Sequence, residues 1–69
     1  MTDYLVIYER AEDGSWSART PDLPVYAVGS SHAEAETEIR SALALHLEVL
    51  RDQGQAPPAS HHVAGIVSV

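Results

Sequence analysis

Histidine has the most versatile chemistry in this 69-residue chain, which carries His32, His46, His61 and His62. An imidazole can bind a metal or move a proton near neutral pH. The adjacent His61 and His62 would point to opposite faces of a strand, which disfavours a shared metal. His46 falls within the apolar face of a predicted helix, with no carboxylate four residues away on that face, so we interpret it as a packed side chain. We expect no metal and no other cofactor.

Nucleophilic and phosphate chemistry find little support in the sequence. There is no cysteine, the glycines are scattered, and no serine lies in a Gly-x-Ser-x-Gly elbow. The acidic residues fall at a predicted turn and on a predicted helix, where solvated carboxylates are the usual outcome. We therefore expect no catalytic residue and a protein that is not an enzyme. A small hydrolase or metal protein using His46, His61 or His62 is the opposing hypothesis.

The charge balance limits the classes of partner. Ten acidic residues face four basic ones, for a formal net charge of −6. Such a chain repels phosphate, so direct nucleic-acid binding is not expected. A basic protein partner fits the charge, although acidic surfaces also serve solubility alone. No apolar run reaches the roughly 20 residues that span a bilayer, and no signal-peptide pattern opens the chain, so we expect a cytoplasmic protein without membrane contact.

Hydrophobic patterning and turn signals predict an α+β fold in a single domain covering residues 1–69. The predicted order is β-β-β-α-β, an antiparallel sheet with one helix packed on one face. Asp13-Gly14 indicates a hairpin, and Pro21 ends the strand that precedes it. The predicted elements are a strand at residues 4–8, a strand at 15–20, a strand at 25–28, a helix at about 31–52 and a final strand at 63–69.

The helix has clear start and stop signals. Ser31 is a good N-cap, and Glu34 three residues later would complete a capping box. Gly54 marks the end, with two prolines beyond it. Apolar or packed positions recur at helical spacing and define the face turned to the sheet; they are Ala35, Ile39, Ala42, Leu43, His46, Leu47 and Leu50.

The first and last predicted strands carry apolar side chains on both faces. One helix covers only one face of a sheet, and an antiparallel sheet with a wet face normally alternates apolar and polar residues. Leaving a large apolar side chain in water forfeits roughly 1.5–3 kcal/mol. We therefore expect a second chain to cover the other face or an edge, which makes the protein a homo-oligomer, either a dimer or a tetramer.

The order of these motifs resembles the HicB-like antitoxin family over roughly residues 4–58. An aromatic-led strand, an acidic-Gly hairpin followed by an aromatic, a Pro-Asp-Leu-Pro turn and a Gly-x-Ser-x-x-Glu-Ala helix start occur in the order typical of that family. The residues that carry the resemblance are Tyr4, Asp13, Gly14, Trp16, Pro21, Asp22, Leu23, Pro24, Gly29, Ser31, Glu34, Ala35, Gly54, Pro57 and Pro58.

This resemblance implies an antitoxin of a type II toxin–antitoxin pair. In that family a degraded, non-catalytic RNase H-like domain binds a small basic HicA-type toxin that cleaves mRNA. Many members also carry a C-terminal DNA-binding domain; no such segment is visible here, so DNA binding is not expected of this chain.

Charge and expected exposure suggest where a basic toxin would bind. The candidate contacts are Glu12, Asp13, Asp22, Glu34 and Glu38. The alternative is that these residues only keep the chain in solution, and that the protein is a stand-alone homo-oligomeric binding or scaffold domain with no toxin partner.

Overall fold

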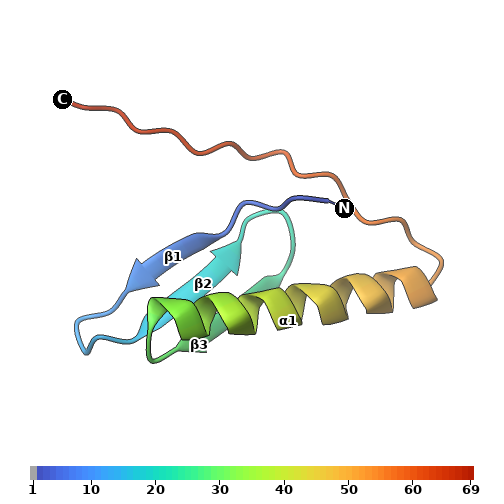
Figure 1. Cartoon of the computed structure of the whole chain (residues 1–69). Coiled ribbons are helices and arrows are strands. Elements are labelled where there is room, and N and C mark those ends of the chain that lie inside the picture. The colour runs from blue at the N-terminus through green and yellow to red at the C-terminus, as the bar shows by residue number, and fades with distance from the viewer. Residues whose placement is uncertain (1) are drawn as a thin grey trace.

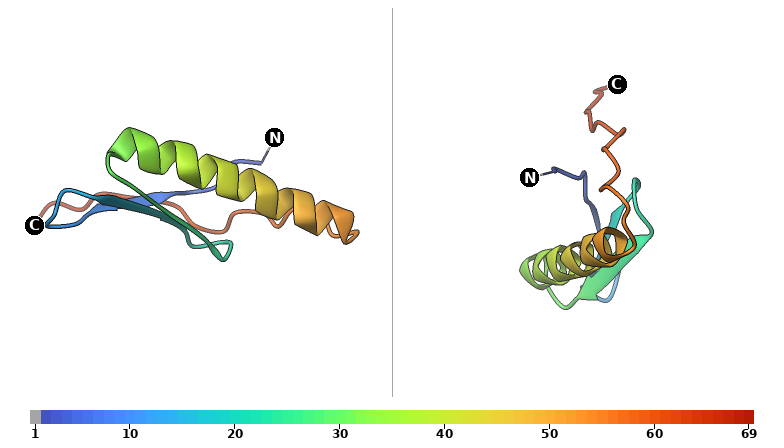
Figure 2. Two further views of the ribbon diagram at one scale, coloured as in Figure 1. Left: turned by 90° about the horizontal axis from the view of Figure 1, so that it is seen from below. Right: turned by 90° about the vertical axis from the view of Figure 1, so that its right-hand side faces the viewer.

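The computed structural model describes residues 2–69 and consists of a three-stranded sheet and one helix. The elements follow in the order β1 (Ile7–Arg10), β2 (Trp16–Thr20), β3 (Val25–Gly29) and α1 (His32–Asp52). The strands form one antiparallel sheet in the order β1-β2-β3, with α1 against one face of it (Figure 1). Figure 2 shows these two layers edge-on. The α+β class and the order of the first four elements are therefore confirmed.

The first strand begins later than predicted, at Ile7 instead of Tyr4. Ile7 pairs with Arg19, so the next residue toward the N-terminus would face Thr20, the last residue of β2. Pro21 follows and has no backbone N–H to donate, which ends the pairing. Residues 4 and 5 are thus left opposite a turn and not opposite a strand.

The helix starts and stops where the sequence predicts. The Ser31 hydroxyl accepts a hydrogen bond from the Glu34 N–H at 3.1 Å, as an N-cap does. The Glu34 carboxylate accepts its bond from the Ser30 hydroxyl at 2.8 Å, so the second half of the predicted capping box is made one residue earlier.

The end of α1 is a Schellman motif around Gly54, whose φ is 77°. The Gly54 N–H donates to the Arg51 carbonyl at 2.9 Å, and the Gln55 N–H donates to the Leu50 carbonyl at 2.9 Å. Within residues 2–69, no helix has the length and apolar character needed to cross a bilayer.

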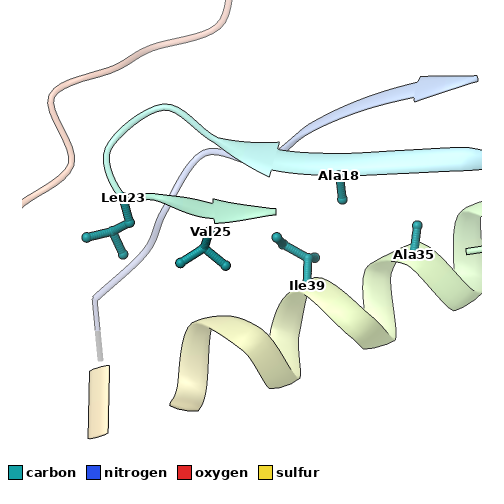
Figure 3. Close-up of a cluster of buried hydrophobic side chains, with 5 residues drawn as sticks. All are labelled: Ala18, Leu23, Val25, Ala35 and Ile39. Carbon is teal, nitrogen blue, oxygen red and sulfur yellow. The ribbon is translucent and has the colours of Figure 1, made fainter. Parts of the chain in front are cut away.

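The core lies between α1 and the two strands β2 and β3 (Figure 3). Its buried apolar side chains are Ala18, Leu23, Val25, Ala35 and Ile39. Ile39 is the largest fully buried side chain, and Tyr4, Val6 and Tyr8 pack on the core from the β1 side, each only half-buried. The core is thus better buried near β3 than near β1.

The predicted final strand at residues 63–69 is not part of the sheet, which corrects that element of the predicted order. Residues 56–69, the C-terminal tail, are extended; after the end of α1 they turn back past the N-terminus and run on along the β1 side of the molecule (Figure 1). A strand requires a neighbour with free N–H and C=O groups, and residues 63–69 pair with no strand in the described chain. Residues 63–69 have the composition of a strand, but no neighbouring strand of the described chain pairs with them.

Candidate binding surfaces

The predicted acidic contacts lie at separate places on the surface. Glu12 and Asp13 are exposed in the β1–β2 connection, whereas Glu34 and Glu38 are exposed on α1. The two pairs of residues therefore lie on different elements. The hydrogen bonds that each carboxylate makes within the chain decide whether it is available to bind a partner.

The carboxylates of Asp13 and Glu34 already accept hydrogen bonds within their own turns. The Asp13 carboxylate accepts bonds from the Ser15 hydroxyl at 2.6 Å and the Ser15 N–H at 2.9 Å. These hydrogen bonds lower the pKa of Asp13, because they favour its ionised form. The Glu34 carboxylate accepts a hydrogen bond from the Ser30 hydroxyl at the start of α1. Substituting Asp13 or Glu34 would therefore change a turn as well as a charge.

Asp22 is the exception among the predicted contacts, because its side chain is only 2% exposed. It lies in the β2–β3 turn and binds the C-terminal tail. Its carboxylate accepts bonds from the Ser60 hydroxyl at 2.7 Å, from the His61 N–H at 3.0 Å and from His62 Nδ1 at 2.6 Å. We call this group of bonds the Asp22 clasp.

The hydrogen bonds of the clasp keep Asp22 ionised. The bond from the His61 N–H, followed by that from Ser60, lowers the pKa of Asp22 from 3.8 to about 2. An ionised carboxylate can only accept hydrogen bonds, so His62 Nδ1 carries the donated proton in this contact. A second bond, from the Tyr4 hydroxyl to the Pro58 carbonyl at 2.6 Å, fixes the tail nearer to α1. Sequence reasoning missed both attachments, which join residues 38 or more positions apart.

Two apolar grooves flank α1. The larger, which we call the β1 groove, has a volume of about 830 Å³ and runs between α1 and the chain segment that leads into β1. Its lining includes Tyr4, Val6 and Tyr8 on one side and Leu43, Ala44 and Leu47 on the other. The smaller, the β3 groove, has about 330 Å³ and lies between α1 and β3; it is lined by Pro24, Val25, Tyr26, Ala42, Leu45, His46 and Val49.

The histidines take different positions. His46 is half-buried in the lining of the β3 groove, as expected for a packed residue. The His32 ring lies 4.2 Å from the Tyr8 ring and 5.2 Å from the Trp16 ring, measured between centroids, a contact that the sequence did not suggest. Across the part of the chain that the structure describes, no three His, Cys, Asp or Glu side chains come together as metal ligands would.

The motif residues serve the fold. Pro21 and Pro24 flank the turn that presents Asp22, and Leu23 from the same turn is buried in the core. Trp16 packs on the core beside His32, and Gly29 is buried where β3 passes under α1.

Comparison with known proteins gives one match. The chain matches, over residues 4–68, a family model described as the HicB_like antitoxin of bacterial toxin-antitoxin system. No curated protein and no solved structure matches it.

Proposed function

Because this chain belongs to the HicB-like antitoxins of bacterial toxin–antitoxin systems, we propose that it binds and occludes a small, basic, mRNA-cleaving toxin of the HicA type. The match over residues 4–68 is the observation that carries this proposal. In this role the chain has no catalytic residue and no cofactor; it acts by covering the toxin in the cytoplasm.

Charge supports this partner class. A toxin that binds RNA must present Lys and Arg side chains to phosphate groups. A chain with a net charge of −6 attracts such a surface and speeds the encounter, and it competes with RNA for the same cations. The same charge argues against DNA binding by these residues.

Exposed carboxylates are the proposed points of contact. Glu12 and Glu38 are exposed, and no hydrogen bond or ion pair within the described chain engages their side chains. Asp13 and Glu34 offer charge while they also hold their own turns. Asp22 meets a partner only when the tail releases it, so its part in binding is to position the tail.

Coexpression tests the proposal. The reading frame beside this gene is searched for a short Lys/Arg-rich protein, which is expressed alone and then with this chain; we expect restored growth and one complex on a sizing column. The double substitution Glu12→Lys with Glu38→Lys should weaken the complex at least tenfold. The control, Glu48→Lys with Asp52→Lys, makes the same change of charge on exposed residues outside the proposed contact and should change affinity less.

Two outcomes would contradict this proposal. If growth stays arrested and no complex forms, the antitoxin role is wrong. If both double variants weaken binding equally, then net charge acts without a defined contact and the named residues are wrong.

A stand-alone homo-oligomeric binding or scaffold domain is the second candidate. It is favoured by the apolar side chains exposed on the tail and on β3, because a second copy of the chain would cover them. An adjacent reading frame that encodes no basic protein would favour this candidate. Self-association as a dimer or tetramer is compatible with both functions.

A further inference from the structure

The end of the C-terminal tail carries apolar side chains that nothing among residues 2–69 covers. Val63, Ile66, Val67 and Val69 are between 85% and 122% exposed. Residues 63–69, which we call the tail end, stand clear of both layers in Figure 1 and in the right-hand view of Figure 2. An exposed, extended and β-branched segment is a template for strand pairing with another chain.

The same chain contains a site that lacks a strand. β1 is at the edge of the sheet, and within the described part of the chain it pairs only with β2, so its other edge is open. Beside this edge is the β1 groove, where Tyr4, Val6 and Leu43 are only half-buried. The core is therefore incomplete along β1, on the side where α1 does not close it.

The tail end fits this site in length and pattern. Its seven residues span about 23 Å when extended, the same length as the seven residues from Tyr4 to the end of β1. Side chains alternate along a strand, so Val63, Val67 and Val69 share one face. Laid along β1, that face would cover the groove with three valines, whereas Ala64, Ile66 and Ser68 would lie on the other side, so the exchange does not bury Ile66 in the groove.

We propose that the tail end of one copy adds as a strand to the free edge of β1 in a second copy and closes its β1 groove. Each chain has one tail end and one open β1 edge. Two copies can therefore exchange their tail ends reciprocally, which gives a dimer with twofold symmetry. The Asp22 clasp and the bond from Tyr4 to Pro58 fix the base of the tail, so the tail end leaves its own body in a defined place. This inference gives the self-association proposed above a structure, and it does not depend on a toxin.

The first test compares the full chain with one that stops after His62, both purified without a toxin. The tail end makes no contact with the core, so the shortened chain should keep its circular dichroism spectrum. Sedimentation at micromolar concentration should give an assembly for the full chain and half that mass, or less, for the shortened one. A full chain that is monomeric, or a shortened chain that keeps the assembly, overturns the proposal.

The second test identifies the site by cross-linking and does not depend on a truncation. The chain has no cysteine, so single cysteines can be placed freely. One sample carries Ala44→Cys in the groove, and a second sample of different tag mass carries either Ile66→Cys or Val67→Cys. After mixing and oxidation, we expect a disulfide between the two samples, stronger for one tail variant because adjacent strand residues face opposite ways.

Ser41→Cys is the matched control, because Ser41 is exposed on α1 and does not line the groove. It should cross-link to the tail variants at least tenfold less than Ala44→Cys does. Equal yields from both helix positions overturn the proposed site. A chain that carries both Ala44→Cys and the tail cysteine, and that closes only on itself, shows that each tail end fills its own groove and overturns the exchange.

Discussion

The Asp22 carboxylate joins the β2–β3 turn to residues that lie 38 to 40 positions further along the chain. It is shielded from water, and it accepts hydrogen bonds from a hydroxyl, a backbone N–H and an imidazole. These hydrogen bonds favour the ionised form of the Asp22 carboxylate over its protonated form. At the scale of single residues, protonation of this acid would therefore change the structure.

The clasp should open in acid. The pKa of Asp22 is lowered from 3.8 to about 2 in the folded chain, so its stabilisation is complete above the free value and is lost as the pH falls through about 2. The His61 amide resonance, followed by NMR, should move from its bound position to its free position between about pH 4 and roughly pH 1.5. Asp22→Asn should give the free position at neutral pH, whereas the exposed control Asp52→Asn should not. An Asp22→Asn chain with a bound tail would contradict the clasp.

Thr20 is a buried residue whose hydroxyl finds no hydrogen-bond partner among residues 2–69. An unpaired buried polar group costs roughly 1–3 kcal/mol of stability. Thr20→Val keeps the branched shape and removes that hydroxyl, so it should raise the free energy of unfolding by about 1 kcal/mol, measured in urea. In the control Thr37→Val, the lost hydroxyl bonds the Ala33 carbonyl on the exposed face of α1, and no gain is expected. A destabilised Thr20→Val chain would mean that the hydroxyl is solvated.

At the scale of elements, the fold depends on how closely β3 passes beneath α1. A Cβ at Gly29 would lie 2.5 Å from the Ala35 backbone nitrogen and 2.9 Å from the Glu34 carbonyl carbon. These are backbone atoms of the first helical turn, so they cannot rotate away. Gly29→Ala should therefore lower the free energy of unfolding by about 1–3 kcal/mol, measured by urea denaturation. Gly65→Ala, where no atom of the single chain lies within 4 Å, is the control, and it should be neutral when both variants are compared at a concentration low enough to keep the chain monomeric. Equal effects would show that the strand and helix adjust freely.

The elements that the sequence predicted are those whose signals are local. Ser31 starts α1, Gly54 ends it and Pro21 ends β2, each through bonds made or denied within a few residues. The clasp could not be predicted, because nothing near Asp22 in the sequence indicates a partner some 40 residues away. The tail end was predicted as a strand from its composition, but composition does not say which chain supplies its neighbour. The partner contacts at Glu12, Asp13, Asp22, Glu34 and Glu38 remain predictions.

At the scale of the whole molecule, the chain is small and its core is limited. The buried apolar side chains are Ala18, Leu23, Val25, Ala35 and Ile39, and two of these are alanines. A domain of this size buries only about 60% of its unfolded surface, and without disulfides it usually gains stability from a partner. The open β1 groove and the exposed tail end are consistent with a molecule completed by assembly.

If assembly completes the core, stability must depend on protein concentration. Mass action stabilises a folded dimer by about 2.7 kcal/mol for a hundredfold rise in concentration, or half of that per chain, which should raise the melting temperature by roughly 5–10 °C. Calorimetry on the full chain from low to high micromolar concentration measures this directly. The chain that stops after His62 is the control, and its melting temperature should be lower and should not change with concentration. A full chain whose melting temperature is the same at every concentration folds alone, and its open groove would then be a property of the monomer.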